Sequence, residues 1–130
     1  MRYALLVLDA PAGRASARTA LRFARAAAAR GHRVDRVFFY GEGVQGGNAL
    51  AVPPQDENDT RAGWRDFAAE HGAELVVCIA AALRRGLLDE NERARYGKSA
   101  ASLDPAFTLA GLGQLADAVL GCDRVLTFGG

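Results

Sequence analysis

Apolar runs that do not alternate with polar residues constrain the fold of this chain more than any other feature. The segment YALLVLDA, residues 3–10, is apolar up to Asp9, and AELVVCI, residues 73–79, is apolar from Leu75 onward. Strands buried on both faces have this pattern, and such strands belong to parallel sheets that are covered by helices. The sequence therefore predicts a mostly parallel sheet with helices on both faces.

Segments with helical spacing separate these runs. Residues 16–30 place alanines and a leucine along one stripe, with Ser16 as the expected N-cap and Gly31 as the expected C-cap. A second helix is expected over residues 58–72, capped near Asp59 or Thr60. Further strands are expected over residues 33–40, 106–111 and 123–128, and further helices over residues 81–86, 87–97 and 112–121. This alternation predicts one α/β domain, residues 1–130, with about five strands in a flavodoxin-like arrangement.

Composition narrows the function classes. The chain has 130 residues and a net charge of +1, so no strong field attracts nucleic acid or an anionic membrane. No apolar run is long enough to span a membrane, and Asp9 interrupts the short N-terminal run before any signal-peptide cleavage site. Two cysteines, Cys78 and Cys122, are too few for a disulfide framework. We therefore expect a cytoplasmic protein with two free thiols.

Glycine motifs give little support for a cofactor. GEGVQG, residues 41–46, follows a strand but leads into a glycine- and proline-rich loop, residues 41–59, rather than into a helix. GLGQLA, residues 111–116, precedes a helix, but no later strand supplies the acid that would bind a ribose. No group of His, Cys and Asp residues has the spacing of metal ligands. We expect neither a cofactor nor a metal.

The order of elements sorts the reactive residues between two edges of the sheet. Cys78 ends a strand, so it lies at the carboxyl edge, where parallel sheets place ligands and chemistry. His32, His71 and Cys122 each precede a strand and lie at the opposite edge. This layout argues against a Cys–His pair of the protease kind and against a disulfide between the two cysteines.

Two interpretations of Cys78 follow from its position. The first is a small buried core residue, because cysteine is among the most buried residue types. The second is a reactive thiol, because the free N–H groups at the start of the next helix favour a thiolate. The residues alone leave both interpretations open.

A family resemblance favours the reactive thiol. The segments CIAAALRRG, FFYGEGV, FTLAGLGQLADAVLGCDRV and RYALLVLDAPAG together resemble TusD-type subunits of the DsrE/TusD sulfurtransferase family, over essentially the whole chain. The resemblance implies a DsrE-like fold and implies that Cys78 carries sulfane sulfur as a persulfide in a sulfur relay. The N–H groups of Ile79, Ala80 and Ala81 are then the expected anion-stabilising donors, and Arg84 is expected to add positive potential.

The resemblance also implies partners. It suggests a heterohexamer with TusB-like and TusC-like chains, a TusA-like sulfur donor and a TusE/DsrC-like acceptor, with the sulfur used to thiolate the wobble uridine of tRNA. Direct contact with nucleic acid is not expected. Two alternatives stay open, namely a DsrE-type subunit of dissimilatory sulfur oxidation and a non-catalytic assembly module that uses the loop from Gly41 to Pro54.

Overall fold

Five parallel strands form the centre of the molecule. The structure, a computed structural model, describes residues 1–130. The strands are β1 (Arg2–Val7), β2 (Arg33–Phe39), β3 (Glu74–Cys78), β4 (Thr108–Ala110) and β5 (Arg124–Phe128). They lie in the order β4-β3-β2-β1-β5, and every neighbouring pair is parallel. The predicted α/β fold with one five-stranded sheet is confirmed.

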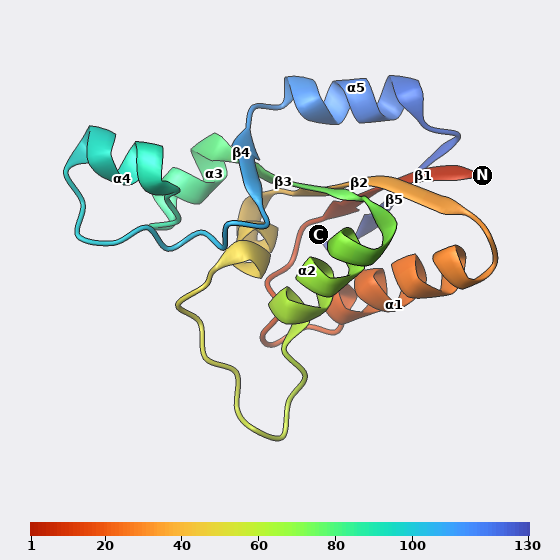
Figure 1. The fold of residues 1–130 in the computed structure, drawn as a ribbon, viewed down its shortest axis with the longest axis horizontal. Coiled ribbons are helices and arrows are strands. Elements are labelled where there is room, and N and C mark those ends of the chain that lie inside the picture. Colours follow the sequence, from red (N-terminus) through yellow and green to blue (C-terminus); the bar gives the residue numbers. More distant parts are fainter.

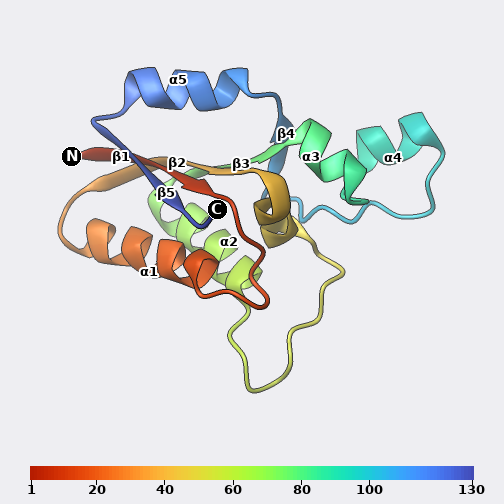
Figure 2. The same ribbon diagram turned by 180° about the vertical axis from the view of Figure 1, so that it is seen from behind.

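Helices cover the sheet on both faces, as predicted. They are α1 (Ser16–Ala29), α2 (Thr60–His71), α3 (Ile79–Arg84), α4 (Glu90–Tyr96) and α5 (Gly113–Gly121), with a 3-10 helix, η1, over Gly41–Gly47. In Figure 1, α1 and α2 lie below the sheet and α5 lies above it, and Figure 2 shows the same layers from behind. The chain winds from β1 toward β4 and then returns across the sheet to β5. Because such crossovers are right-handed, this reversal places α5 on the opposite face from α1 and α2.

Helix α1 packs on the sheet through small side chains. Its buried residues are Ala17, Ala20, Leu21, Ala24 and Ala27, which recur at the predicted helical spacing. Alanine is short, so the helix axis can lie close to β1, β2 and β5, which α1 contacts. All five residues of this stripe belong to the hydrophobic core.

Helix α2 adds two aromatic side chains to the core. Oδ1 of Asp59 accepts a hydrogen bond of 3.1 Å from the backbone N–H of Ala62, which confirms the predicted cap. Trp64 and Phe67 are buried, and the Trp64 ring meets the Phe39 ring edge to face at 5.8 Å between centroids. These residues pack within the chain and fix α2 against the middle of the sheet.

Three local predictions are wrong. Ser16 does not cap α1, because Ala15 occupies the cap position and the Ser16 hydroxyl instead donates to Asp9 at 2.8 Å. The predicted C-cap of α1, Gly31, is one residue too late: Arg30 is the cap residue, and Gly31 follows it with a φ of 84°. The segment expected to be wholly loop contains η1, whose turns close with local backbone hydrogen bonds.

None of the helices has the length and apolarity that crossing a membrane would require.

Candidate functional site

Cys78 stands at the junction that the sequence predicted. It is the last residue of β3, where it pairs with Ala110 of β4, and it occupies the N-cap position of α3 with a ψ of 119°. Strand β3 stops there because the chain turns directly into the helical residues that begin at Ile79. The thiol therefore lies at the carboxyl edge, beside the first turn of a helix.

Cys78 is buried, which is the environment expected by the first of the two interpretations of this residue. The residue is 3% exposed, because its strand lies between β2 and β4 and the helix that follows packs against η1 and β4. Ala80, two residues further along, is exposed. The sulfur is thus covered in the isolated chain, at a point where the backbone reaches the surface within two residues.

A close backbone approach holds η1 in place over this edge. The N–H of Gly43 donates to the carbonyl of Leu8 at 3.2 Å, and a Cβ at this position would lie 2.1 Å from the carbonyl oxygen of Val7. Only glycine fits there. Val44 is fully buried beside it. Of the glycines that resemble a nucleotide fingerprint, Gly43 therefore serves to bring η1 against the end of β1.

An ion pair joins η1 to the end of α3. Nε of Arg85 donates to Oε1 of Glu42 at 2.7 Å, and the same guanidinium donates to the carbonyl of Ala81 at 3.0 Å. Both side chains reach solvent, so the pair contributes about 0–1 kcal/mol. It links η1 to the end of α3, the helix that begins directly after Cys78.

The segment between α4 and β4, which we call the second wall of the site, is fixed through Ser102. The hydroxyl of Ser102 donates to the carbonyl of Gly86 at 2.6 Å and accepts from the N–H of Leu88 at 3.2 Å. The carbonyl of Ser102 accepts from the N–H of Ala49 at 2.7 Å, so one residue joins three loops. This connection fixes the end of α3 relative to the chain that leaves η1.

A buried carboxylate anchors the same wall to α2. Asp104 is almost fully buried, forms an ion pair with Arg61 through Oδ2, and lies 3.5 Å from a guanidinium nitrogen of Arg65. Its Oδ1 accepts from the N–H of Ala106 at 2.9 Å. Sequence reasoning missed this residue. The Asp-Pro dipeptide signalled a turn here, but nothing in the sequence indicated its ionic partners.

Arg84 lies at the far end of α3 from the sulfur. The helix rises about 1.5 Å per residue, so six residues separate Arg84 from Cys78 by roughly 9 Å along the axis. With Leu83, Tyr96 and Lys98 it lines an open hollow of about 640 Å³ between α3, α4 and the following segment. The first turn, Ile79 to Ala81, adjoins Cys78, and Arg84 does not.

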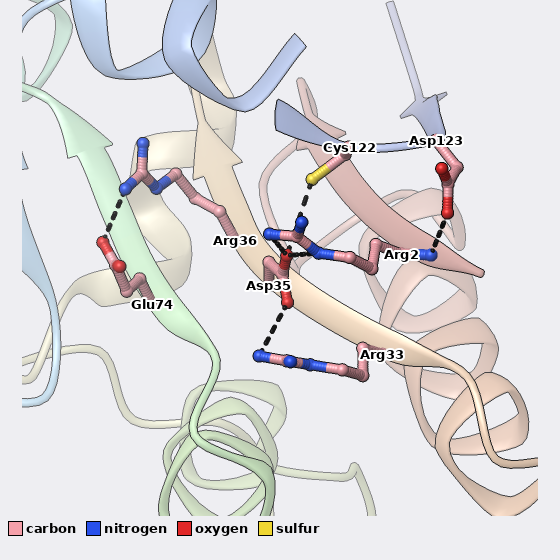
Figure 3. A network of polar contacts seen from close by, with 7 residues as sticks. All are labelled: Arg2, Arg33, Asp35, Arg36, Glu74, Cys122 and Asp123. Atoms are coloured by element: carbon pink, nitrogen blue, oxygen red, sulfur yellow. Dashed lines mark hydrogen bonds and ion pairs between the residues drawn. The ribbon is translucent and has the colours of Figure 1, made fainter. Parts of the chain in front are cut away.

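The remaining reactive residues lie at the opposite edge, as predicted. Cys122 precedes β5, and both cysteines are free thiols. Figure 3 shows Cys122 in a network with Arg2 and Asp35, which come from the starts of β1 and β2. Burial, followed by the nearby Asp35 carboxylate, raises the pKa of the Cys122 thiol. His71 ends α2, on the amino side of β3.

The site can therefore do thiol chemistry at one position. No group of three or more His, Cys, Asp or Glu residues is placed to hold a metal ion. GLGQLA contributes the start of α5, where no side chain caps the helix. The feature that distinguishes the carboxyl edge is one cysteine between a buried strand and a helical turn.

Comparison with known proteins gives this geometry a family. The sequence matches the family model of the DsrE/DsrF-like family over residues 1–128. This chain belongs to the DsrE/DsrF-like family. The sulfurtransferase TusD of Salmonella newport (strain SL254) is 49% identical over 128 residues, which cover 98% of this chain and 100% of that relative. The resemblance stated from the sequence, and the sulfurtransferase class that it implied, are confirmed.

A solved structure supports the fold. The crystal structure of the ychN protein from E. coli superposes with a TM-score of 0.75 and covers 98% of this chain and 100% of that chain. The two sequences are 23% identical, so this likeness concerns the fold alone. The DsrE-like form of the predicted parallel sheet is thereby confirmed.

Proposed function

We propose that this DsrE/DsrF-like sulfurtransferase is a subunit of a sulfur relay and carries sulfane sulfur as a persulfide on Cys78. One observation carries the proposal. In a chain 49% identical to a sulfurtransferase, the thiol at the carboxyl edge of the sheet is Cys78, and it sits at the start of a helix. The other thiol, Cys122, lies at the opposite edge.

The proposed chemistry needs one thiol and no cofactor. The Cys78 thiolate attacks the outer sulfur of a donor persulfide, a new S–S bond forms, and the donor's S–S bond breaks to release the donor thiolate. The reverse exchange passes the sulfur to an acceptor thiolate. The first N–H groups of a helix have no partner within it, so those of Ile79, Ala80 and Ala81 are available to the sulfur anion.

Access to the sulfur of Cys78 requires movement where α3 packs against η1, a contact that we call the seam. Cys78 is buried, while Ala80 is exposed and the Glu42–Arg85 pair that bridges the seam is weak. We infer that separation of these two segments admits the carrier. In this account burial shields the persulfide from stray thiols between transfers.

The finer roles follow the family resemblance. We propose that a TusA-like protein donates the sulfur, that a TusE/DsrC-like protein accepts it, and that the chain works in a heterohexamer with TusB-like and TusC-like subunits. The proposed end use is 2-thiolation of the wobble uridine of tRNA, in the cytoplasm. The net charge of +1 supports a role without direct RNA contact.

Reconstitution of the relay tests the proposal. The chain is purified with its TusB-like and TusC-like partners, loaded from a persulfidated TusA-like donor and mixed with the acceptor, whose persulfide is then measured. Cys78→Ser is expected to abolish transfer, and Cys122→Ser is expected to keep it. Transfer at the wild-type rate by Cys78→Ser would refute the proposal.

The burial of Cys78 also favours a second candidate, a non-catalytic assembly module. At 3% exposure the thiol has the environment of a core cysteine. This candidate predicts that Cys78→Ala assembles with the partner chains and keeps full cellular thiolation. Normal assembly together with lost thiolation would exclude it.

A further inference from the structure

The presence of a second cysteine, Cys122, raises the question of why sulfur would be loaded on Cys78 alone. Cys122 is partly exposed, whereas Cys78 is buried. It borders an open hollow of about 280 Å³ between α5 and the amino edge of the sheet, lined also by Arg2, Asp35 and Asp117. A chain that loads sulfur on Cys78 therefore carries another thiol that is easier for a small persulfide to reach.

A fixed carboxylate faces this second thiol. Sγ of Cys122 donates to Oδ2 of Asp35 at 3.9 Å, as Figure 3 shows. The same Oδ2 accepts from Nε of Arg2 at 2.7 Å, and Arg33 lies 3.3 Å from Oδ1. The Asp35 side chain is 17% exposed. Two guanidinium groups thus hold this carboxylate in place, where it accepts a hydrogen bond from S–H and would repel S⁻.

Other charges around the thiol partly oppose one another. Arg2 from β1 and Arg36 from β2 favour the thiolate, while Asp35 and Asp123 disfavour it. The same hollow is also lined by Arg33, Glu74 of β3 and Asp117 of α5. Burial and the carboxylates outweigh the guanidinium groups, so the pKa of Cys122 is raised.

We propose that Asp35 holds Cys122 in its thiol form and thereby confines sulfur acceptance to Cys78. The inference rests on the proposed function, because it explains which thiol takes the sulfur. The reaction that Asp35 suppresses is attack by the Cys122 thiolate on the outer sulfur of a persulfide. That attack would form an S–S bond at Cys122, break the donor's S–S bond and release the donor as a thiolate.

The pH profile of Cys122 alkylation tests the role of Asp35. In a Cys78→Ser background, the reaction with iodoacetamide is followed between pH 6 and pH 10 (about the range over which thiols ionise). Asp35→Asn leaves the Arg2 and Arg36 guanidinium groups acting on the sulfur, and we expect its midpoint to fall by about one unit and its rate at pH 7 to rise about tenfold. Arg2→Gln removes a cation instead, and we expect a rate about threefold lower.

Asp35→Asn and Arg2→Gln together distinguish an electrostatic role of Asp35 from a structural role in which losing the ion pair loosens the packing around Cys122. Both break the ion pair between Arg2 and Asp35, so a purely structural role would accelerate alkylation in both. Asp117→Asn makes the same charge change in the same hollow, and it is expected to leave the profile unchanged. Shifts of Asp35→Asn and Arg2→Gln in the same direction, or no shift for Asp35→Asn, would overturn the inference.

Sulfur labelling then connects the effect to function. Wild type and Asp35→Asn are treated with glutathione persulfide, and sulfur is located by peptide mass spectrometry. We expect sulfur on Cys78 alone in the wild type and on both cysteines in Asp35→Asn. Equal labelling of Cys122 in both proteins would overturn the inference. Sulfur on Cys122 in Asp35→Asn, with none on Cys78 in either protein, would support the role of Asp35 and refute the proposed function.

Discussion

Arg85 holds Glu42 at 2.7 Å across the seam between α3 and η1. The two residues are far apart in the chain, yet their side chains bridge the two segments that cover the end of β3. Cys78 is buried at the start of α3, so we expect this exposed ion pair to influence the accessibility of the buried thiol.

Removal of this pair is expected to expose Cys78. In a Cys122→Ser background, Glu42→Gln should raise the rate at which Cys78 reacts with a chromogenic disulfide by about two- to fivefold, since an exposed pair contributes up to about 1 kcal/mol. Glu57→Gln is the matched control, because Glu57 is exposed and forms no ion pair. Equal rates for Glu42→Gln and wild type would show that the seam does not limit access.

Substitution of Gly43 is expected to destabilise the protein. In Gly43→Ala the new Cβ would lie 2.1 Å from the Val7 carbonyl oxygen, which belongs to the sheet and cannot move freely. We expect a loss of about 1–3 kcal/mol in the free energy of unfolding, measured by urea denaturation. Gly113→Ala meets no atom within 4 Å and should change stability by less than about 1 kcal/mol. Equal unfolding midpoints for the two variants would contradict this account of η1.

Loss of the Asp104 carboxylate is expected to weaken the second wall. Asp104→Asn removes the charge that two arginines contact and leaves the Arg61 guanidinium, which is partly buried, with the weaker Asp59 contact. We expect a loss of about 1.5–3 kcal/mol, measured by chemical denaturation. Asp66→Asn changes an exposed residue on the same helix as Arg61 and should stay within about 0.5 kcal/mol of wild type. A similarly small change in Asp104→Asn would mean that the ion pair does not stabilise the fold.

Acid should weaken the contact between β1 and α1. The Ser16 hydroxyl, the N–H of Gly130 and the Arg14 guanidinium lower the pKa of Asp9. A carboxyl group with a lowered folded-state pKa stabilises the protein above its unfolded-state pKa, about 3.9, and loses that effect as the pH falls through the folded-state value. The stability difference between wild type and Asp9→Asn should therefore be constant at neutral pH and shrink below about pH 4. Urea titrations at pH 7 and pH 3 measure it (values chosen about either side of that pKa), and a difference that grows in acid would contradict the assignment.

The sequence predicted the strands and helices that form the layers of the fold better than it predicted helix caps and short helical turns. Apolar runs and alanine stripes follow directly from burial, so β1, β3 and α1 lie where their patterns indicated. The cap of α1 was missed because Ser16 bonds to Asp9, a contact that depends on how β1 and α1 meet. The 3-10 helix was missed because a run of glycines carries no helical periodicity.

The candidate site was predicted in position but not in environment. Strand polarity alone placed Cys78 at the carboxyl edge and Cys122 at the other. The burial of Cys78 could not be read from the sequence, because it depends on the packing of α3 against η1. The pairing of Cys122 with Asp35 likewise joins residues 87 positions apart, and no local pattern reveals such a contact.

Sulfur occupancy at each cysteine tests the central claim most directly. Wild type, Cys78→Ser and Cys122→Ser are assembled with the proposed partner subunits, loaded by the proposed sulfur donor, alkylated and mapped by peptide mass spectrometry. The account predicts one added sulfur on the peptide of Cys78 in wild type and in Cys122→Ser, and none in Cys78→Ser. Sulfur that persists in Cys78→Ser and disappears in Cys122→Ser would contradict it.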